Sequence, residues 1–210
     1  MERWAGKSAI VTGAASGIGR AITIALLKKN VNVLALDVQT EKLSTLANEW
    51  NPNWGRIQIR RCNINDENDL ESAFFHLESI AHKSWNGGAD IMVNNAGVIE
   101  YTRVIGKIFA DRNERNNLRY YRIFMRNAFY EPYNFDQSLL VFNVTRFYLQ
   151  SISPGIVETD IAKHTPTISK TLENIPALRP EDVADAVIYA LGTRPEVQIT
   201  ELTIQRTGEA

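Results

Sequence analysis

The segment that decides the fold reads Thr12-Gly13-Ala14-Ala15-Ser16-Gly17-Ile18-Gly19. It follows the apolar run 8–11 directly and precedes a helix-like run at 20–27. A strand, a glycine-rich turn and a helix in this order predict a cradle for the phosphates of a dinucleotide, because glycines allow close backbone approach and a helix start offers unpaired N–H groups. The alternative is an ordinary strand-to-helix turn.

Within this turn the hydroxyl groups of Thr12 and Ser16 add polar contacts to those of the backbone. The expected phosphate contacts are Thr12, Gly13, Ser16, Gly17, Ile18 and Gly19. Asp37 stands at the end of the next apolar run, 31–36, where a carboxylate can accept hydrogen bonds from both hydroxyls of an adenosine ribose. The alternative for Asp37 is a helix N-cap or a solvated loop acid.

The same carboxylate would repel a 2′-phosphate, and Val38 and Gln39 offer no arginine to bind one. The expected cofactor is therefore NAD, and NADP is the less favoured one.

Strand-like and helical patterns alternate along most of the chain, which is typical of βαβ units on a parallel sheet. We therefore predict one α/β domain over 1–210, a doubly wound, mostly parallel, Rossmann-like sheet that is disrupted between residues 101 and 150. The expected strands are 7–12, 31–36, 57–62, 90–94, one ending at 153–155, and 197–205, and the expected helices are 17–29, 40–50, 66–82 and one starting at Pro180.

The composition changes abruptly in 101–150, which holds twelve of the nineteen aromatic residues but one glycine and one lysine. Leu118, Tyr121, Met125, Ala128 and Phe129 fall at helical spacing and predict a helix that Pro132 would end. The run 139–142 is strand-like. Phe, Tyr, Asn and Ile are favoured by AT-rich codons, so one hypothesis is a translated intron or a misjoined exon.

Charge and cysteine content restrict the function classes. A formal net charge of −1 gives no basic face for nucleic acid or for an anionic membrane surface. The single cysteine, Cys62, cannot form an intrachain disulfide and offers no thiolate metal cluster, so no metal site is expected. The chain shows neither a signal peptide nor an apolar run of about 18 residues, and the expected location is the cytoplasm.

Three motifs stand in order along the chain: the glycine turn, Asn94-Asn95-Ala96-Gly97, and Pro154-Gly155-Ile156-Val157-Glu158-Thr159. Together they resemble the short-chain dehydrogenase/reductase family. The segments 1–19, 151–164 and 179–205 are most similar to its farnesol-dehydrogenase-like branch. The middle of the chain does not match.

The resemblance implies further cofactor contacts. Asn63 and Ile64 match a pair that contacts adenine, with an amide here in place of the usual carboxylate. Asparagine can still accept a hydrogen bond from an exocyclic amine through its carbonyl oxygen. Asn95, Ala96 and Gly97 would line the central part of the cofactor, or form only a turn that closes a strand. Ile156 and Thr159 would contact the nicotinamide, or belong to a plain loop.

The resemblance also implies a catalytic Tyr-x-x-x-Lys pair on one helix, in which the ammonium lowers the phenol pKa. None of the seven tyrosines has a lysine four positions later, and Lys107 is the only lysine between Gly97 and Ser151. The neighbours of Asn117, Ser138 and Ser151 do not match the family's asparagine and serine. No residue is assigned as catalytic.

The leading hypothesis is an NAD(P)-dependent oxidoreductase that transfers a hydride between nicotinamide and an alcohol or ketone, with an isoprenoid alcohol as one candidate. The competing hypothesis is an inactive NAD(H)-binding pseudoenzyme or a truncated or mis-spliced product. A purely structural module using the aromatic segment is a third. A homo-oligomer is compatible with the family, although the helices that usually form its interface are not identifiable.

Overall fold

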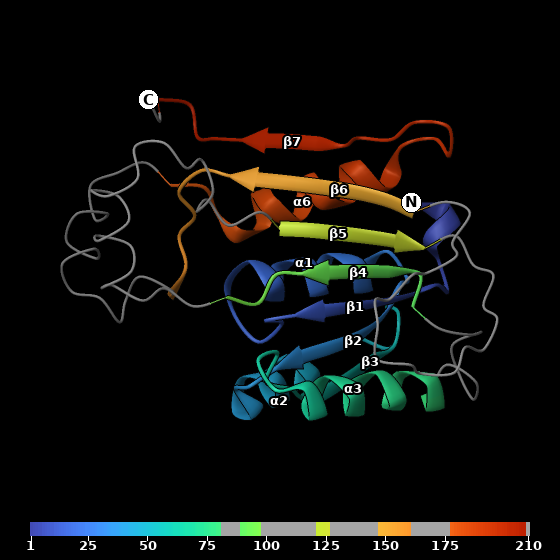
Figure 1. Cartoon of the computed structure of the whole chain (residues 1–210). Helices are drawn as coiled ribbons and strands as arrows, with labels where there is room; N and C mark the ends of the chain where they lie inside the picture. The colour runs from blue at the N-terminus through green and yellow to red at the C-terminus, as the bar shows by residue number, and fades with distance from the viewer. Residues whose placement is uncertain (81–88, 98–120, 127–146, 161–176, 209–210) are drawn as a thin grey trace.

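A computed structural model describes residues 1–80, 89–97, 121–126, 147–160 and 177–208 (Figure 1). The described elements are a 3₁₀ helix η1 (Glu2–Trp4), the helices α1 (Gly17–Lys28), α2 (Thr40–Asn48), α3 (Glu67–Ile80) and α6 (Pro180–Gly192), and the strands β1 (Ser8–Thr12), β2 (Asn32–Asp37), β3 (Ile57–Arg61), β4 (Ile91–Asn94), β5 (Tyr121–Arg126), β6 (Phe147–Pro154) and β7 (Glu201–Ile204). None of the described helices is long and apolar enough to cross a membrane.

The strands form one sheet in the order β3-β2-β1-β4-β5-β6-β7. Neighbours pair in parallel from β3 to β4 and again between β6 and β7. Helices lie on the sheet's two faces (Figure 1). The predicted doubly wound, mostly parallel α/β sheet is therefore confirmed.

β5 is the exception, because it runs antiparallel to both β4 and β6 (Figure 1). The helix predicted from Leu118 to Phe129 is wrong over Tyr121–Arg126, which is a strand. This stretch includes Tyr121, Ile123 and Phe124, residue types that favour strands, and it fills the gap between β4 and β6 that would otherwise leave two edges unpaired. The strand expected at 139–142 lies outside the described residues.

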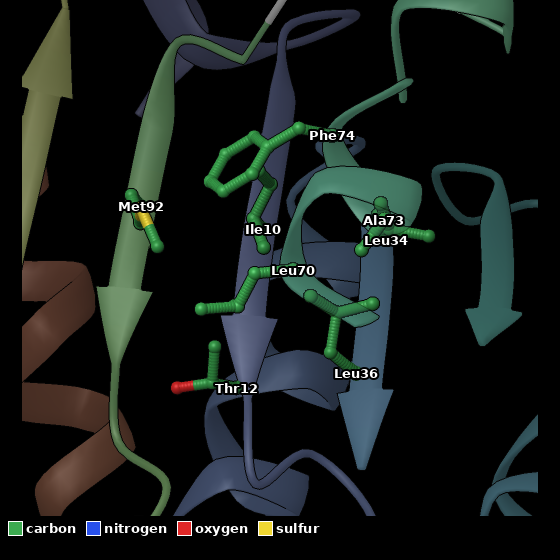
Figure 2. Close-up of a pocket in the computed structure, with 8 residues that line it drawn as sticks. All are labelled: Ile10, Thr12, Leu34, Leu36, Leu70, Ala73, Phe74 and Met92. Atoms are coloured by element: carbon green, nitrogen blue, oxygen red, sulfur yellow. The ribbon is translucent and has the colours of Figure 1, made fainter. Parts of the chain in front are cut away.

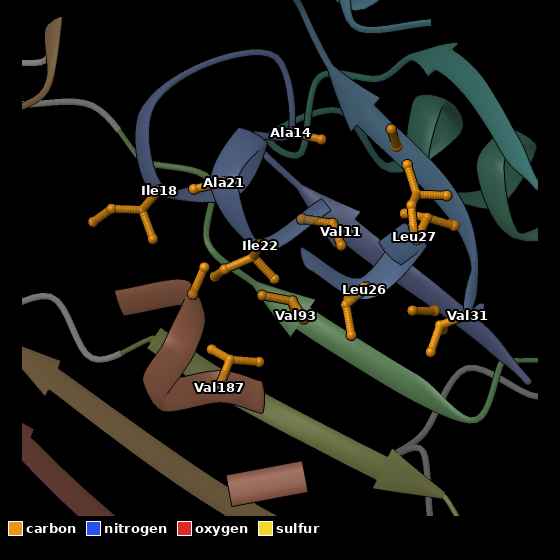
Figure 3. Packing of buried hydrophobic residues seen from close by; sticks show 14 of the residues in the cluster. Val11, Ala14, Ile18, Ala21, Ile22, Leu26, Leu27, Val31, Val93 and Val187 are labelled. Atoms are coloured by element: carbon orange, nitrogen blue, oxygen red, sulfur yellow. The ribbon is translucent and has the colours of Figure 1, made fainter. Parts of the chain in front are cut away.

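The larger core lies between the sheet and the helices α1, α2 and α6 (Figure 3). Val11 and Val93 project from the sheet towards Ile22 of α1 and Val187 of α6. β1 and β2 are buried along their whole length, as expected for central parallel strands covered on both faces. This core fixes the start of α1 against the end of β1, where the glycine turn lies.

A smaller core under α3 covers the opposite face, where Ile10 and Leu34 contact Ala73 and Leu77. Beside it lies a hollow with an apolar lining, between α3 and the strands β1, β2 and β4 (Figure 2); it is lined by Ile10, Thr12, Leu34, Leu36, Leu70, Ala73, Phe74 and Met92. Phe74 lines this hollow and keeps 43% of its surface exposed.

The N-terminal η1 is tied to the end of α6. The Trp4 indole Nε1–H donates to the Leu191 carbonyl at 2.7 Å, and the Arg3 guanidinium donates to the same oxygen at 3.1 Å. These bonds satisfy a carbonyl that the end of a helix leaves without an intrahelical partner.

Candidate functional site

The expected site residues gather at one edge of the sheet, the edge formed by the carboxyl ends of the parallel strands. Thr12 and Asp37 end β1 and β2, Asn63 follows β3, Asn95 follows β4, and Ile156 follows β6. Ligands of open α/β sheets bind in the crevice outside these carboxyl ends. The sequence motifs therefore converge on the place where this fold offers a site.

The glycine turn needs glycine for two different reasons. Gly13 and Gly17 have φ of +65° and +51°, a conformation that residues with a Cβ rarely adopt. Gly19 needs space instead, because a Cβ there would lie 2.1 Å from the Gly13 carbonyl oxygen and 2.4 Å from Asn95 Nδ2. The turn is thus folded tightly onto the first turn of α1.

The start of α1 presents unpaired backbone donors. Ser16 is the N-cap, and its side chain makes no capping hydrogen bond. Among the described residues, the N–H groups of Ser16, Gly17, Ile18 and Gly19 have no hydrogen-bond partner. Together with the positive end of the helix dipole, such donors suit an anionic group.

Thr12 and Asn95 join the glycine turn to the end of β4. Thr12 Oγ1 accepts the N–H groups of Asn95 at 3.0 Å and Ala96 at 3.1 Å, and it donates to the Val93 carbonyl at 3.3 Å. Asn95 Nδ2 donates to the carbonyls of Thr12 at 3.0 Å and Gly13 at 3.2 Å. These side chains therefore hold the turn in shape, and the buried Thr12 hydroxyl has its donor and both acceptor positions engaged.

Asp37 connects the glycine turn to the end of β2. Its Oδ2 accepts the Ala15 N–H at 3.0 Å and its Oδ1 accepts the Gln39 N–H at 2.9 Å. Each carboxylate oxygen keeps one further acceptor position. The side chain is held in place with capacity for two more donors, although only 7% of the residue is exposed.

Asn63 closes a turn immediately after β3. Its Oδ1 accepts the Asn65 N–H at 3.1 Å, while its own N–H donates to Asp69 Oδ2 at 2.8 Å. The next side chain, Ile64, leaves 39% of its surface exposed at the site edge. The preceding residue, Cys62, is buried, and burial raises the pKa of its thiol, with Asp69 adding to the effect, so this sulfur stays protonated.

The segment after β6 passes over the glycine turn. A Cβ on Gly17 would lie 3.1 Å from Thr159 Cγ2, so the Thr159 methyl group rests against the first residue of α1. The next residue, Asp160, pairs with Lys42 of α2 at 3.9 Å between Oδ2 and Nζ. Sequence reasoning missed this ion pair, because nothing in the spacing of two exposed residues from distant segments links them.

All fourteen expected cofactor contacts lie within the described residues, and the structure brings them to the same edge of the sheet. Lys107, Asn117 and Ser138, none of which is assigned as catalytic, lie outside the described part of the chain, whereas Ser151 lies on β6.

The model of the short-chain dehydrogenase family matches residues 7–129 of this chain. The chain belongs to this family, whose members are oxidoreductases. It is 32% identical to the farnesol dehydrogenase of Aedes aegypti, with 100% of this chain and 99% of that protein covered. It is 29% identical to dehydrogenase/reductase SDR family member 11 of Mus musculus, with 99% and 96% covered.

The alignment with the farnesol dehydrogenase runs over 253 positions, although this chain has 210 residues. The relative therefore contains residues that have no counterpart here.

Solved structures show the same fold. A serine dehydrogenase complexed with NADP+ superposes with a TM-score of 0.67 at 21% identity, covering 97% of this chain and 96% of that one. An L-sorbose reductase complexed with NADPH and L-sorbose gives a TM-score of 0.60 at 17% identity, with 98% and 97% covered.

Proposed function

We propose that residues 1–210 form one dinucleotide-binding domain that holds a nicotinamide dinucleotide along the carboxyl edge of the sheet. The observation that carries this proposal is the start of α1, where the N–H groups from Ser16 to Gly19 have no partner among the described residues. The Asp37 carboxylate is held beside this turn by the Ala15 N–H. The glycine turn fits a pyrophosphate because its backbone conformation disfavours side chains and because its donors have no hydrogen-bond partner among the residues that the structure describes.

The proposed contacts follow the order of the strands. Gly13 and Gly17–Gly19 hold the pyrophosphate, with Ser16 adding a hydroxyl. Asp37 accepts the ribose hydroxyls, and Asn63 and Ile64 contact the base. Asn95, Ala96 and Gly97 line the middle of the cofactor, Ile156 and Thr159 orient the nicotinamide, and Thr12 acts indirectly by fixing the turn.

The proposed cofactor is NAD(H) rather than NADP(H). The two structural relatives named above carry NADP+ and NADPH, but here Asp37 places a negative charge where a 2′-phosphate would lie. Equilibrium titrations followed by nicotinamide fluorescence should give a Kd for NADH that is at least about tenfold lower than for NADPH. Asp37→Asn keeps the size of the side chain and removes the charge, so it should narrow this difference. Tighter binding of NADPH to the unaltered protein would contradict the preference.

The proposed reaction is hydride transfer between the nicotinamide and an alcohol or ketone, with isoprenoid alcohols tested first because a farnesol dehydrogenase is among the similar proteins. The nicotinamide ring, when bound, accepts or supplies the hydride. The residues of this chain position the nicotinamide ring.

The second candidate is a protein that binds NAD(H) without turnover. The observation that favours it is the lack of a lysine four positions after any of the seven tyrosines. Purified protein incubated with NAD and farnesol separates the two candidates. Substrate-dependent formation of NADH supports the oxidoreductase, whereas saturable NADH binding without turnover supports the binder. Absence of NADH binding would contradict both.

A further inference from the structure

Residues 156–160, which we call the strap, cross the carboxyl edge of the sheet. The strap follows β6, whereas Lys42, which pairs with its last residue Asp160, lies on α2, the helix after β2. β6 and β2 are four places apart in the sheet, which corresponds to about 19 Å. Five residues of chain extend over at most about 18 Å. The strap and the lysine side chain therefore follow a nearly direct path along this edge.

The start of the strap is held by backbone hydrogen bonds. The Leu178 N–H donates to the Ile156 carbonyl at 2.7 Å, and the Glu158 N–H donates to the Leu178 carbonyl at 2.8 Å. Further along, a Cβ on Gly17 would lie 3.1 Å from Thr159 Cγ2. The strap thus rests on the first residue of α1.

The far end of the strap is held by the ion pair between Asp160 Oδ2 and Lys42 Nζ, which lie 3.9 Å apart. The side chains of Lys42 and Asp160 are 48% and 50% exposed. Exposed ion pairs contribute little to stability and are weakened by salt. The end of the strap at α2 is therefore the end that opens more readily.

A dinucleotide bound as proposed above would lie beneath the strap, and the present inference rests on that proposed function. Its pyrophosphate would contact the start of α1, against which Thr159 lies. Its ribose would contact Asp37, which lies at the end of β2, between the strap's origin on β6 and Lys42 on α2. Entry and release of the dinucleotide then require the strap to lift.

We propose that the Lys42–Asp160 pair is a latch on the dinucleotide site, and that its opening limits the rates of dinucleotide entry and release. The pair joins two protein side chains, neither of which is a proposed cofactor contact. It therefore stabilises the closed strap equally with and without a bound dinucleotide. Loss of the pair should raise both rate constants by the same factor and leave the Kd unchanged.

The test measures the association and dissociation rate constants of NADH by stopped-flow fluorescence in Lys42→Gln, Asp160→Asn and the double variant. Each single variant should raise both rate constants about two- to fivefold, the range expected for an exposed ion pair. The double variant should show no further increase, since the first substitution already removes the pair. In about 1 M salt the unaltered chain and the variants should have the same rate constants.

Two controls remove the same charges at exposed positions outside the strap and α2. These controls, Lys29→Gln and Asp185→Asn, should leave both rate constants as in the unaltered chain. The exchange Lys42→Asp with Asp160→Lys re-forms a pair of opposite charges and should restore slow entry and release. Thermal unfolding of each variant checks that the fold is kept.

The outcomes separate the latch from the function on which it rests. If NADH binds and neither single variant changes the rate constants, the proposed function stands and the latch is overturned. A higher Kd in Lys42→Gln together with an unchanged or lower Kd in Asp160→Asn would also overturn the latch, because Lys42 would then contact the dinucleotide directly. If the unaltered chain does not bind NADH, the proposed function fails and this inference fails with it.

Discussion

Gly19 has the closest backbone neighbour within the glycine turn. A methyl group at this position would overlap the Gly13 carbonyl oxygen, so Gly19→Ala should lower the free energy of unfolding by about 1–3 kcal/mol and weaken NADH binding. Urea unfolding and NADH titration measure the two effects. Gly192→Ala is the control, because the nearest atom to its new methyl group would be Met1 Cγ at 3.9 Å. Equal stability of the two variants would contradict the prediction.

Gln150 lies on β6 with 1% of its surface exposed, and neither Nε2 nor Oε1 has a hydrogen-bond partner in the described part of the chain. Alternation along β6 places it on the same face as Ile152, which belongs to the larger core. A methionine side chain is similar in length to glutamine and carries no amide that would be left unpaired. Gln150→Met should therefore raise the free energy of unfolding by about 1–3 kcal/mol. Gln58→Met at an exposed position on β3 should give no such gain in urea unfolding. A loss of stability in Gln150→Met would show that the amide is satisfied.

At the scale of single residues, the sequence predicts which positions lie at the site but not what each side chain does there. The convergence of Gly13, Asp37 and Asn95 follows from motif spacing, because the carboxyl ends of parallel strands share one edge. The role of the Thr12 hydroxyl does not follow, since its three hydrogen-bond partners lie on or next to β4, about eighty residues away along the chain.

At the scale of elements, the start of α6 gives a dependence of stability on pH. The Arg179 N–H donates to Asp182 Oδ2 at 2.7 Å, and the Arg179 guanidinium donates to Oδ1 at 3.2 Å. The bond from the backbone first, and that from the side chain second, lower the pKa of Asp182. Because the pKa is lower in the folded chain, this contribution to stability is complete above the unfolded value of about 3.9 and is lost as the pH falls through the folded value.

Asp182→Asn should therefore lower the urea unfolding midpoint at neutral pH, and the difference from the unaltered chain should disappear in acid. Asp185→Asn, at an exposed position on the same helix, should show a smaller difference at neutral pH. A difference for Asp182→Asn that persists unchanged into acid would contradict the assignment to the charged hydrogen bonds.

Most elements could be predicted because their patterns are local. The helix α1 begins at Gly17 as predicted, and it ends at Lys28, one residue before the prediction. β5 could not be predicted, since 118–129 fits a helical period while the stretch Tyr121–Arg126 also contains strand-forming residues. The stretch forms a strand because it pairs with the edges of β4 and β6. These two strands come from distant parts of the chain, so the local pattern does not indicate the pairing.

At the scale of the whole molecule, 101–150 has an atypical composition, and the alignment with the farnesol dehydrogenase spans 253 positions against 210 residues in this chain. Both observations raise the question of which exons encode the middle of the protein. We predict that full-length transcripts from the same gene include one that encodes a serine and a Tyr-x-x-x-Lys segment between Gly97 and Ser151. Sequencing cDNA across these codons tests this prediction. If every transcript encodes the present segment, the catalytic pair is lost from this protein and the binder without turnover is favoured.

The direction of β5 has a consequence for how this protein can change. β5 is antiparallel to both neighbours, so β4 and β6 still point the same way, and Asn95 and Gly155 still emerge at the same edge. A middle strand of either direction would preserve that arrangement. We infer that a strand of the opposite direction in the place of β5 would leave the directions of β4 and β6, and the edge at which Asn95 and Gly155 lie, as they are.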